Sequence, residues 1–214
     1  MHLPEVKVCG ITRTEDAENA LNLGASKLGF ILYNNSPRCI KIEDILRIKD
    51  DLNLQPDKMV AVEVEPDIRY LEKIKEFGFG FFQIHFSLQF SLEKIKQWSD
   101  LLGPKNLWLA PKIPPEMSFP SEILKLADTF LIDAYSDKEF GGTGKISNWD
   151  AFREWKTKYP QKKWILAGGL SPENVISALK VTNTVNLDVN SGVEKSPGIK
   201  DKKKLINFFE KISL

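Results

Sequence analysis

Short apolar segments recur along the chain at nearly even spacing. Eight of them occupy residues 6–9, 28–32, 59–64, 81–84, 107–110, 130–132, 164–166 and 185–189. Their length and the turn residues around them predict β-strands. Between strands, apolar residues recur at helical spacing, clearest over 17–24, 42–48, 68–77 and 205–212. Strands that alternate with helices predict a parallel sheet covered by helices.

The number of strand–helix units decides between two folds. Eight units in 214 residues leave about 27 residues each, which is near the lower limit for a closed (β/α)8 barrel. An open, doubly wound sheet is the alternative, but the even spacing favours the barrel. No linker or repeat divides the chain, so we expect one domain over residues 1–214. The proline-rich stretch 111–120 is expected to be a long loop after the fifth strand.

Polar residues mark three expected helix starts. Thr12 and Glu15 have the spacing of a capping box. Ser171 followed by Pro172 has the pattern of an N-cap and a first helical residue. Asp201 is expected to cap the final helix.

Composition and charge exclude several classes of protein. The chain is 42% hydrophobic and has no apolar run near 18 residues, so we expect no membrane segment. Thirty Lys and Arg balance 29 Asp and Glu, whereas nucleic-acid binders usually carry a basic excess. No secretory signal is visible, which favours the cytoplasm. The two cysteines lack metal-ligand spacing and are too few for a disulfide framework.

Two candidate catalytic residues stand at strand ends. Cys9 ends the first strand and is followed by Gly10, and Asp133 ends the sixth strand. In a (β/α)8 barrel the carboxyl ends of the strands carry the active site, and a thiol with a carboxyl can serve as base and acid. On position alone, Cys9 is equally well interpreted as a small buried hydrophobic residue. Cys39 is expected to pack.

Lys7 lies two residues before Cys9, so both side chains point to the same face of the strand. If that face is the barrel interior, the ammonium group lies beneath the thiol. A nearby cation lowers the pKa of a thiol and increases its thiolate fraction. We therefore expect Lys7 to activate Cys9.

Two glycine-rich turns follow the last two strands. Gly168 and Gly169 occur in the first turn, and Ser191 and Gly192 in the second. Glycine lets backbone N–H groups approach an anion, and the loops after strands seven and eight often bind phosphate in this fold. Tight turns with glycine as a helix C-cap are the alternative interpretation. Two such turns at neighbouring strands favour phosphate binding.

Two further loops carry polar residues. Residues 137–147 contain Gly141, Gly142, Gly144 and Lys145, but their spacing does not match a nucleotide phosphate loop. A glycine-hinged lid after the sixth strand is a better interpretation. Arg38, after the second strand, either binds a carboxylate or is a solvated loop residue, and by itself the pattern favours the latter.

Five sequence blocks together resemble the phosphoribosylanthranilate isomerase family. They are VKVCGITRTEDA at 6–17, LGFI at 28–31 with SPR at 36–38, Asp133 with GGTGK at 141–145, LAGGLSPENV at 166–175 and DVNSGVE at 188–194. The blocks occur in the family's order and span nearly the whole chain. The resemblance implies a (β/α)8 barrel that converts N-(5'-phosphoribosyl)anthranilate to an aminodeoxyribulose phosphate.

The same resemblance implies a role for each candidate residue. Cys9 corresponds to the general base and Asp133 to the general acid, which must keep its proton near neutral pH. Arg38 and Asp188 correspond to substrate-binding residues, with Arg38 facing the anthranilate carboxylate. The phosphate cradle corresponds to Gly168, Gly169, Ser191 and Gly192. The expected ligand is a small phosphorylated substrate, with no metal or other cofactor, and the chain is expected to be a monomer or a homodimer.

Two departures from the family pattern affect the aromatic pocket. Glu63 occupies a position that is usually aromatic on the third strand, and Phe86 occupies a usual glycine after His85. Two alternatives to the isomerase remain open. One is a related phosphosugar enzyme, of which a metal-dependent epimerase fits poorly because His2 and His85 are the chain's two histidines. The other is a barrel without activity that binds a phosphorylated ligand or a partner protein.

Overall fold

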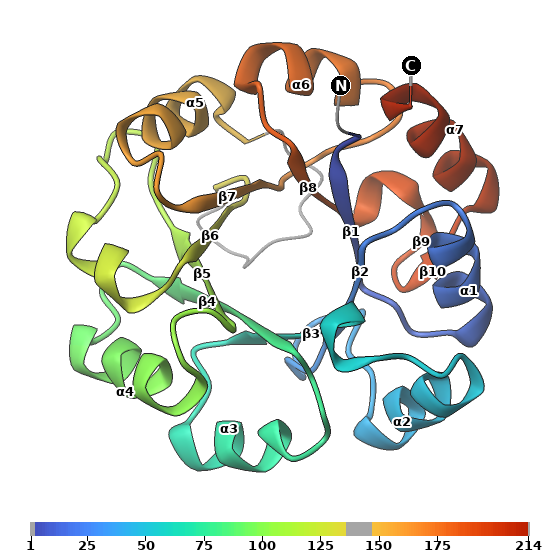
Figure 1. Cartoon of the computed structure of the whole chain (residues 1–214), viewed down its shortest axis with the longest axis horizontal. Coiled ribbons are helices and arrows are strands. Elements are labelled where there is room, and N and C mark those ends of the chain that lie inside the picture. The colour runs from blue at the N-terminus through green and yellow to red at the C-terminus, as the bar shows by residue number, and fades with distance from the viewer. Residues whose placement is uncertain (1–2, 136–146, 214) are drawn as a thin grey trace.

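The eight predicted strands form a closed barrel in which every neighbouring pair is parallel (Figure 1). This computed structural model describes residues 3–135 and 147–213. The strands are β1 (Glu5–Cys9), β2 (Lys27–Ile31), β3 (Met59–Val64), β4 (Phe81–Ser87), β5 (Leu107–Lys112), β6 (Thr129–Ile132), β7 (Lys163–Leu166) and β8 (Asn186–Val189). Each strand pairs with the next, and β8 pairs with β1. The predicted (β/α)8 barrel is confirmed, and the open sheet is wrong.

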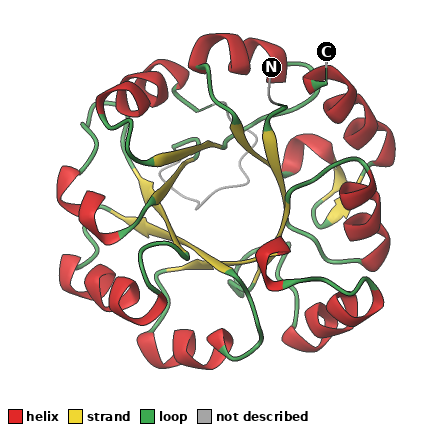
Figure 2. Cartoon of the chain, viewed as in Figure 1, coloured by secondary structure: helices red, strands yellow, loops and turns green. Residues whose placement is uncertain are grey.

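Helices surround the barrel (Figure 2). They are α1 (Thr14–Asn22), α2 (Ile42–Asp51), α3 (Ile68–Lys75), α4 (Leu92–Leu102), α5 (Trp149–Lys158), α6 (Val175–Thr182) and α7 (Lys202–Ile212), with a short 3-10 helix η1 (Pro56–Lys58) before β3. Between β5 and β6 the chain forms a long loop and the 3-10 helix η2 (Ser121–Leu126) in place of an α-helix. None of the helices seen in the described segments has the length and hydropathy needed to cross a bilayer.

An unpredicted hairpin lies between β8 and α7. The 3-10 helix η3 (Ser191–Val193) leads into the antiparallel strands β9 (Glu194–Ser196) and β10 (Ile199–Lys200). The hairpin lies outside the barrel, close to α1 and α7 (Figure 1). Its strands are polar and very short, so no apolar run marks them in the sequence.

Alternating side chains of the strands build two cores. Outward-facing residues such as Val8 and Phe30 pack against the helices. Inward-facing residues form a second cluster, which contains Cys9, Val60, Val62, Trp108, Ala110, Leu131, Ile165 and Ala167. Because successive residues of a strand face opposite sides, Lys7 shares the interior with Cys9 and is only 2% exposed. The predicted placement of both side chains inside the barrel is confirmed.

The three expected helix starts differ in outcome. Asp201 caps α7, because its carboxylate accepts hydrogen bonds from the backbone N–H groups of Lys203 and Lys204. The capping box is wrong: α1 begins at Thr14, and the Thr12 hydroxyl donates to the Gly198 carbonyl of the hairpin. The expected N-cap at Ser171 is also wrong, because residues 172–174 form a turn and α6 begins at Val175.

Candidate active site

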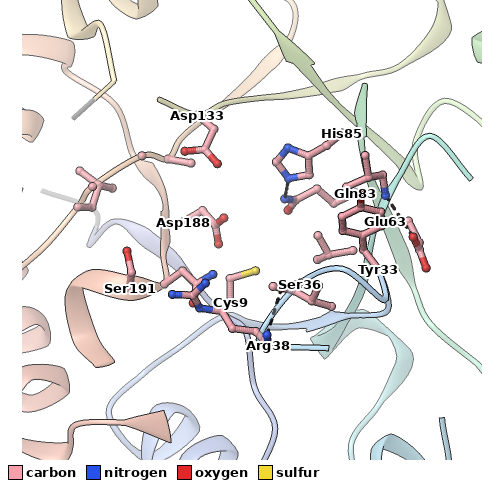
Figure 3. Close-up of a pocket in the computed structure, with 18 residues that line it drawn as sticks. Cys9, Tyr33, Ser36, Arg38, Glu63, Gln83, His85, Asp133, Asp188 and Ser191 are labelled. Carbon is pink, nitrogen blue, oxygen red and sulfur yellow. Dashed lines mark hydrogen bonds between the residues drawn. The ribbon is translucent and has the colours of Figure 1, made fainter. Parts of the chain in front are cut away.

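One cavity opens at the carboxyl ends of the strands, and both candidate catalytic residues line it (Figure 3). Cys9 is the last residue of β1, and Asp133 directly follows β6. Asp188 of β8 also faces the cavity. The other polar and glycine residues of the wall are Tyr33, Ser36, Arg38, Glu63, Gln83, His85, Gly168, Gly169, Asn190 and Ser191. The structure thus brings together residues that are far apart in the sequence.

Cys9 lies beside a buried ion pair. Lys7 Nζ donates to Asp188 Oδ1 at 2.7 Å, and both side chains are nearly inaccessible. Gly29 on β2 leaves room for this group, because a Cβ there would lie 2.8 Å from Cys9 Sγ and 2.9 Å from Lys7 Nζ. Burial raises the pKa of the Cys9 thiol, Lys7 opposes that rise, and Asp188 adds to it. Lys7 therefore acts in the predicted direction, but the pKa of Cys9 stays above its ordinary value.

Asp133 has the properties of a carboxyl group that remains protonated unusually far toward neutral pH. Burial raises its pKa to about 6, against the opposing effect of the Ala134 backbone N–H, which donates to Oδ1 at 2.7 Å. The nearby Asp188 carboxylate raises the pKa further. This direction agrees with the expectation that Asp133 holds a proton.

Arg38 is buried in the wall of the cavity, so the interpretation of a solvated loop residue is wrong. Its guanidinium forms a bidentate pair with Glu194 of β9, with Nη2 2.8 Å from Oε2 and Nε 3.0 Å from both oxygens. Lys200 Nζ donates to the same carboxylate at 2.9 Å. Burial opposes ionisation of Glu194, but these two cations hold the pKa of its carboxyl below the ordinary value. Our sequence reasoning missed Glu194 as a partner, although it ends the last of the five blocks.

The two glycine-rich turns lie side by side. Gly168 and Gly169 have positive φ angles of 85° and 62°, a left-handed conformation that favours glycine. Gly192 packs so closely on the Leu170 carbonyl that a Cβ there would overlap the oxygen. Both turns follow strands, which rules out a helix C-cap role. Gly168, Gly169 and Ser191 line the cavity, whereas Gly192 packs against Leu170 and Ser171 of the other turn.

The two departures from the family pattern have different effects on the cavity. Phe86 points away from it, is 1% exposed and packs edge-on against Trp98. The expected effect of Phe86 on the pocket is therefore wrong. Glu63 does line the cavity. Burial raises the pKa of its carboxyl, against the effect of a hydrogen bond with Tyr70.

His85 is a buried neutral side chain. Its Nε2 lies 2.8 Å from the Gln83 side-chain nitrogen, and burial lowers its pKa to about 4. Within residues 3–135 and 147–213, His, Cys, Asp and Glu form no group of three that could hold a metal ion. The predicted lid with Gly141, Gly142, Gly144 and Lys145 lies outside the described residues.

The fold and the cavity define a class of protein: a (β/α)8 barrel with ionisable groups facing glycine-rich turns at the carboxyl ends of its strands. Residues 6–211 match the family model of N-(5'-phosphoribosyl)anthranilate isomerase. The chain belongs to this family.

Known relatives agree over nearly the whole chain. The isomerase of Petrotoga mobilis is 38% identical over 200 residues, covering 92% of this chain and 90% of the relative. That of Crocosphaera subtropica is 35% identical over 210 residues and 97% of each chain. The crystal structure of the Thermus thermophilus isomerase is similar with a TM-score of 0.78, 29% identity and 98% coverage of each chain. Another similar isomerase structure, with a TM-score of 0.75, 26% identity and 99% coverage of each chain, contains reduced 1-(o-carboxyphenylamino)-1-deoxyribulose 5-phosphate.

Proposed function

We propose that this chain converts N-(5'-phosphoribosyl)anthranilate to 1-(2-carboxyphenylamino)-1-deoxyribulose 5-phosphate. The observation that carries the proposal is that Cys9 and Asp133 face one cavity whose wall includes the turns at Gly168, Gly169 and Ser191. Membership of the isomerase family supports this reaction. The reaction belongs to tryptophan biosynthesis, and we propose that the protein acts in the cytoplasm. One isomerase of similar structure, from Thermotoga maritima, is described as dimeric, and a monomer or a homodimer fits the proposal.

Asp133 acts as the general acid in the first step. Its proton passes to the furanose ring oxygen while the bond between that oxygen and C1' breaks, and the nitrogen lone pair forms the protonated Schiff base. A pKa of about 6 keeps a usable fraction of Asp133 protonated near neutral pH. Cys9 acts as the base in the second step, and its thiolate takes the proton from C2'. The resulting enolamine gains a proton at C1' and loses the proton of its 2'-hydroxyl, which gives the ketose.

The remaining residues bind the two anionic ends of the substrate. Backbone N–H groups of the turns that contain Gly168, Gly169, Ser191 and Gly192 bind the phosphate. Arg38 binds the anthranilate carboxylate. Asp188 holds Lys7 beside Cys9 and faces the substrate from β8.

The substitutions Cys9→Ala and Asp133→Asn test this assignment. Each should lower kcat by about 10²–10⁴, because each removes a proton-transfer group. The fluorescence of anthranilate derivatives follows turnover directly, and binding of the reduced product analogue shows whether affinity survives. Matched controls are Cys39→Ala, which removes the other cysteine, and Asp128→Asn, which removes an exposed carboxyl paired with Lys162.

Three outcomes separate the alternatives. Turnover of either catalytic variant within about threefold of wild type would contradict the assigned roles. Ligand binding by the wild-type protein without turnover would favour the barrel without activity. Turnover of a different ribulose phosphate, and not of the anthranilate compound, would favour a related phosphosugar enzyme.

A further inference from the structure

Arg38, which lines the cavity, forms ion-pair contacts with Glu194, and Glu194 with Lys200; we refer to the three side chains as the Arg38–Glu194–Lys200 cluster. Arg38 comes from the connection between β2 and α2, Glu194 from β9 and Lys200 from β10. They are 8%, 6% and 4% exposed. A buried carboxylate is stable only when donors satisfy its oxygens, and here the donors come from two separate loops. The cluster therefore joins the loop after β2 to the hairpin after β8.

Both oxygens of Glu194 accept hydrogen bonds and are surrounded by donors. Oε1 accepts from Arg38 Nε at 3.0 Å, from Lys200 Nζ at 2.9 Å and from the Gly198 backbone N–H at 3.2 Å. Oε2 accepts from Arg38 Nε at 3.0 Å and Nη2 at 2.8 Å. An amide in place of this carboxylate would direct an NH2 group at one of these donors.

The hairpin that carries Glu194 is itself anchored to the barrel. The backbone N–H of Lys200 donates to Asp16 of α1 at 3.0 Å, and Lys200 Nζ donates to Asn190 Oδ1 at 2.9 Å. Asn190 lines the cavity next to Ser191. Glu194 is thus a fixed acceptor, and the guanidinium that it binds in a bidentate pair is held in one plane.

We propose that Glu194 is a positioning residue, which holds Arg38 in the orientation that binds the substrate carboxylate. This inference rests on the proposed function. Among the described residues, the hydrogen bonds to this guanidinium use Nε and Nη2, so Nη1 supplies donors for a ligand in the cavity that Arg38 lines. Two cations and one anion leave the cluster with one excess positive charge. Because Glu194 already fixes the Arg38 side chain in the folded protein, substrate binding does not bear the entropic cost of ordering that side chain.

A purely electrostatic role of Glu194 predicts the opposite effect. Its negative charge would repel a substrate carboxylate, so its removal would strengthen binding. Positioning predicts weaker binding that is confined to ligands that carry the carboxylate. The sign and the selectivity of the effect therefore distinguish the two roles.

The experiment measures the affinity of two compounds for wild type and for Glu194→Gln. One compound is reduced 1-(o-carboxyphenylamino)-1-deoxyribulose 5-phosphate, and the other is the same compound without the ring carboxylate. Glu194→Gln should weaken binding of the first about tenfold and of the second less than about twofold. With substrate, KM should rise about tenfold and kcat should change less than about threefold, because the carboxylate does not react. Glu5→Gln, which breaks an exposed ion pair with Lys163, is the matched control and should change neither affinity.

Glu194→Asp keeps the charge and shortens the side chain by one methylene group. Glu194→Asp should lose less affinity, and the loss should again be confined to the compound with the ring carboxylate. If Glu194→Gln does not bind the second compound, Glu194→Asp distinguishes positioning from a purely structural role. Equal losses for both compounds in Glu194→Asp would indicate a purely structural role and would overturn the inference. Unchanged or tighter binding of the carboxylate compound would also overturn it. A wild-type protein that binds neither compound would overturn the proposed function and this inference with it.

Discussion

Cys9 lies beside an ion pair whose two charges act on the pKa of its thiol in opposite directions. The Lys7 ammonium favours the thiolate, whereas burial and the Asp188 carboxylate favour the neutral thiol. The position of Cys9 at a strand end and that of Lys7 two residues earlier are local features, so the sequence was enough to predict them. The ion pair of Lys7 with Asp188 joins residues 181 positions apart, and no local pattern indicates it.

Removal of the Lys7 charge and removal of the Asp188 charge should therefore shift the pKa of Cys9 in opposite directions. Lys7→Met should raise it and slow alkylation of Cys9 by iodoacetamide at pH 8. Asp188→Asn should lower it and speed the same reaction. The rate of alkylation against pH measures both shifts in a Cys39→Ala background, which leaves one cysteine to react. Equal apparent pKa values in the two variants would contradict this account.

The contrast between Thr12 and Asp201 shows the same limit of local patterns. Asp201 binds backbone groups two and three residues away, and the prediction of a cap is correct. Thr12 has the spacing for a cap but binds a carbonyl 186 residues away. Arg38 likewise finds its partner 156 residues away, which is why its burial was not predicted.

At the scale of elements, the relative position of the loops after β7 and β8 depends on a close contact between Gly192 and the Leu170 carbonyl. Strand ends and glycine-rich turns are visible in the sequence, so the position of the proposed phosphate cradle follows from the predicted order of strands. The contact between Gly192 and the Leu170 carbonyl is not visible, because it depends on how the two loops meet. The hairpin of β9 and β10 was missed for a different reason, since its few residues do not form an apolar run.

Gly192→Ala should push these two loops apart. Its Cβ would meet a backbone oxygen that cannot rotate away, so we expect a loss of about 1–3 kcal/mol in stability. Affinity for inorganic phosphate, measured as competitive inhibition, should fall about tenfold as N–H groups lose their alignment. Gly103→Ala is the control, because no atom lies within 4 Å of the position that its Cβ would take, although its φ is 79°. It should cost about 1 kcal/mol of stability and leave phosphate inhibition unchanged. Unchanged inhibition in Gly192→Ala would contradict the role of this contact.

At the scale of the molecule, the carboxyl group of Asp133 lowers the free energy of unfolding at neutral pH. The native pKa of Asp133 is about 6, above its ordinary value of 3.8. Between these values the native protein keeps a proton that the unfolded chain has lost, so stability falls as pH rises and the full cost is reached above pH 6. The periodicity of the sequence was enough to predict the barrel. The loss of stability on ionisation of Asp133 could not be predicted in this way, because it depends on how deeply the closed structure buries the carboxyl group.

Asp133→Asn should therefore be more stable than wild type at pH 8 by about 3 kcal/mol, from a pKa that rises from 3.8 to about 6 on folding. The difference should shrink as pH falls through 6 and vanish only below the ordinary pKa of 3.8, where Asp133 is protonated in both the native and the unfolded protein. Urea unfolding at several pH values measures it. The opposite pH dependence of His85, whose pKa is lowered to about 4, is shared by both proteins and cancels. Asp128→Asn provides the control at an exposed position, and equal stability of Asp133→Asn and wild type at pH 8 would contradict the prediction.

The ion pair between Lys7 and Asp188 also links the first strand of the barrel to the last, where the two residues are register partners. During synthesis on the ribosome, Lys7 and Cys9 emerge long before Asp188 exists. Until β8 docks, the ammonium group has no buried counter-ion, and the segment that carries Ser191 and Glu194 is also absent. A nascent chain that stops before the eighth strand therefore lacks the carboxylate beside Cys9, one of the two turns proposed to bind phosphate and the partner of Arg38 all at once.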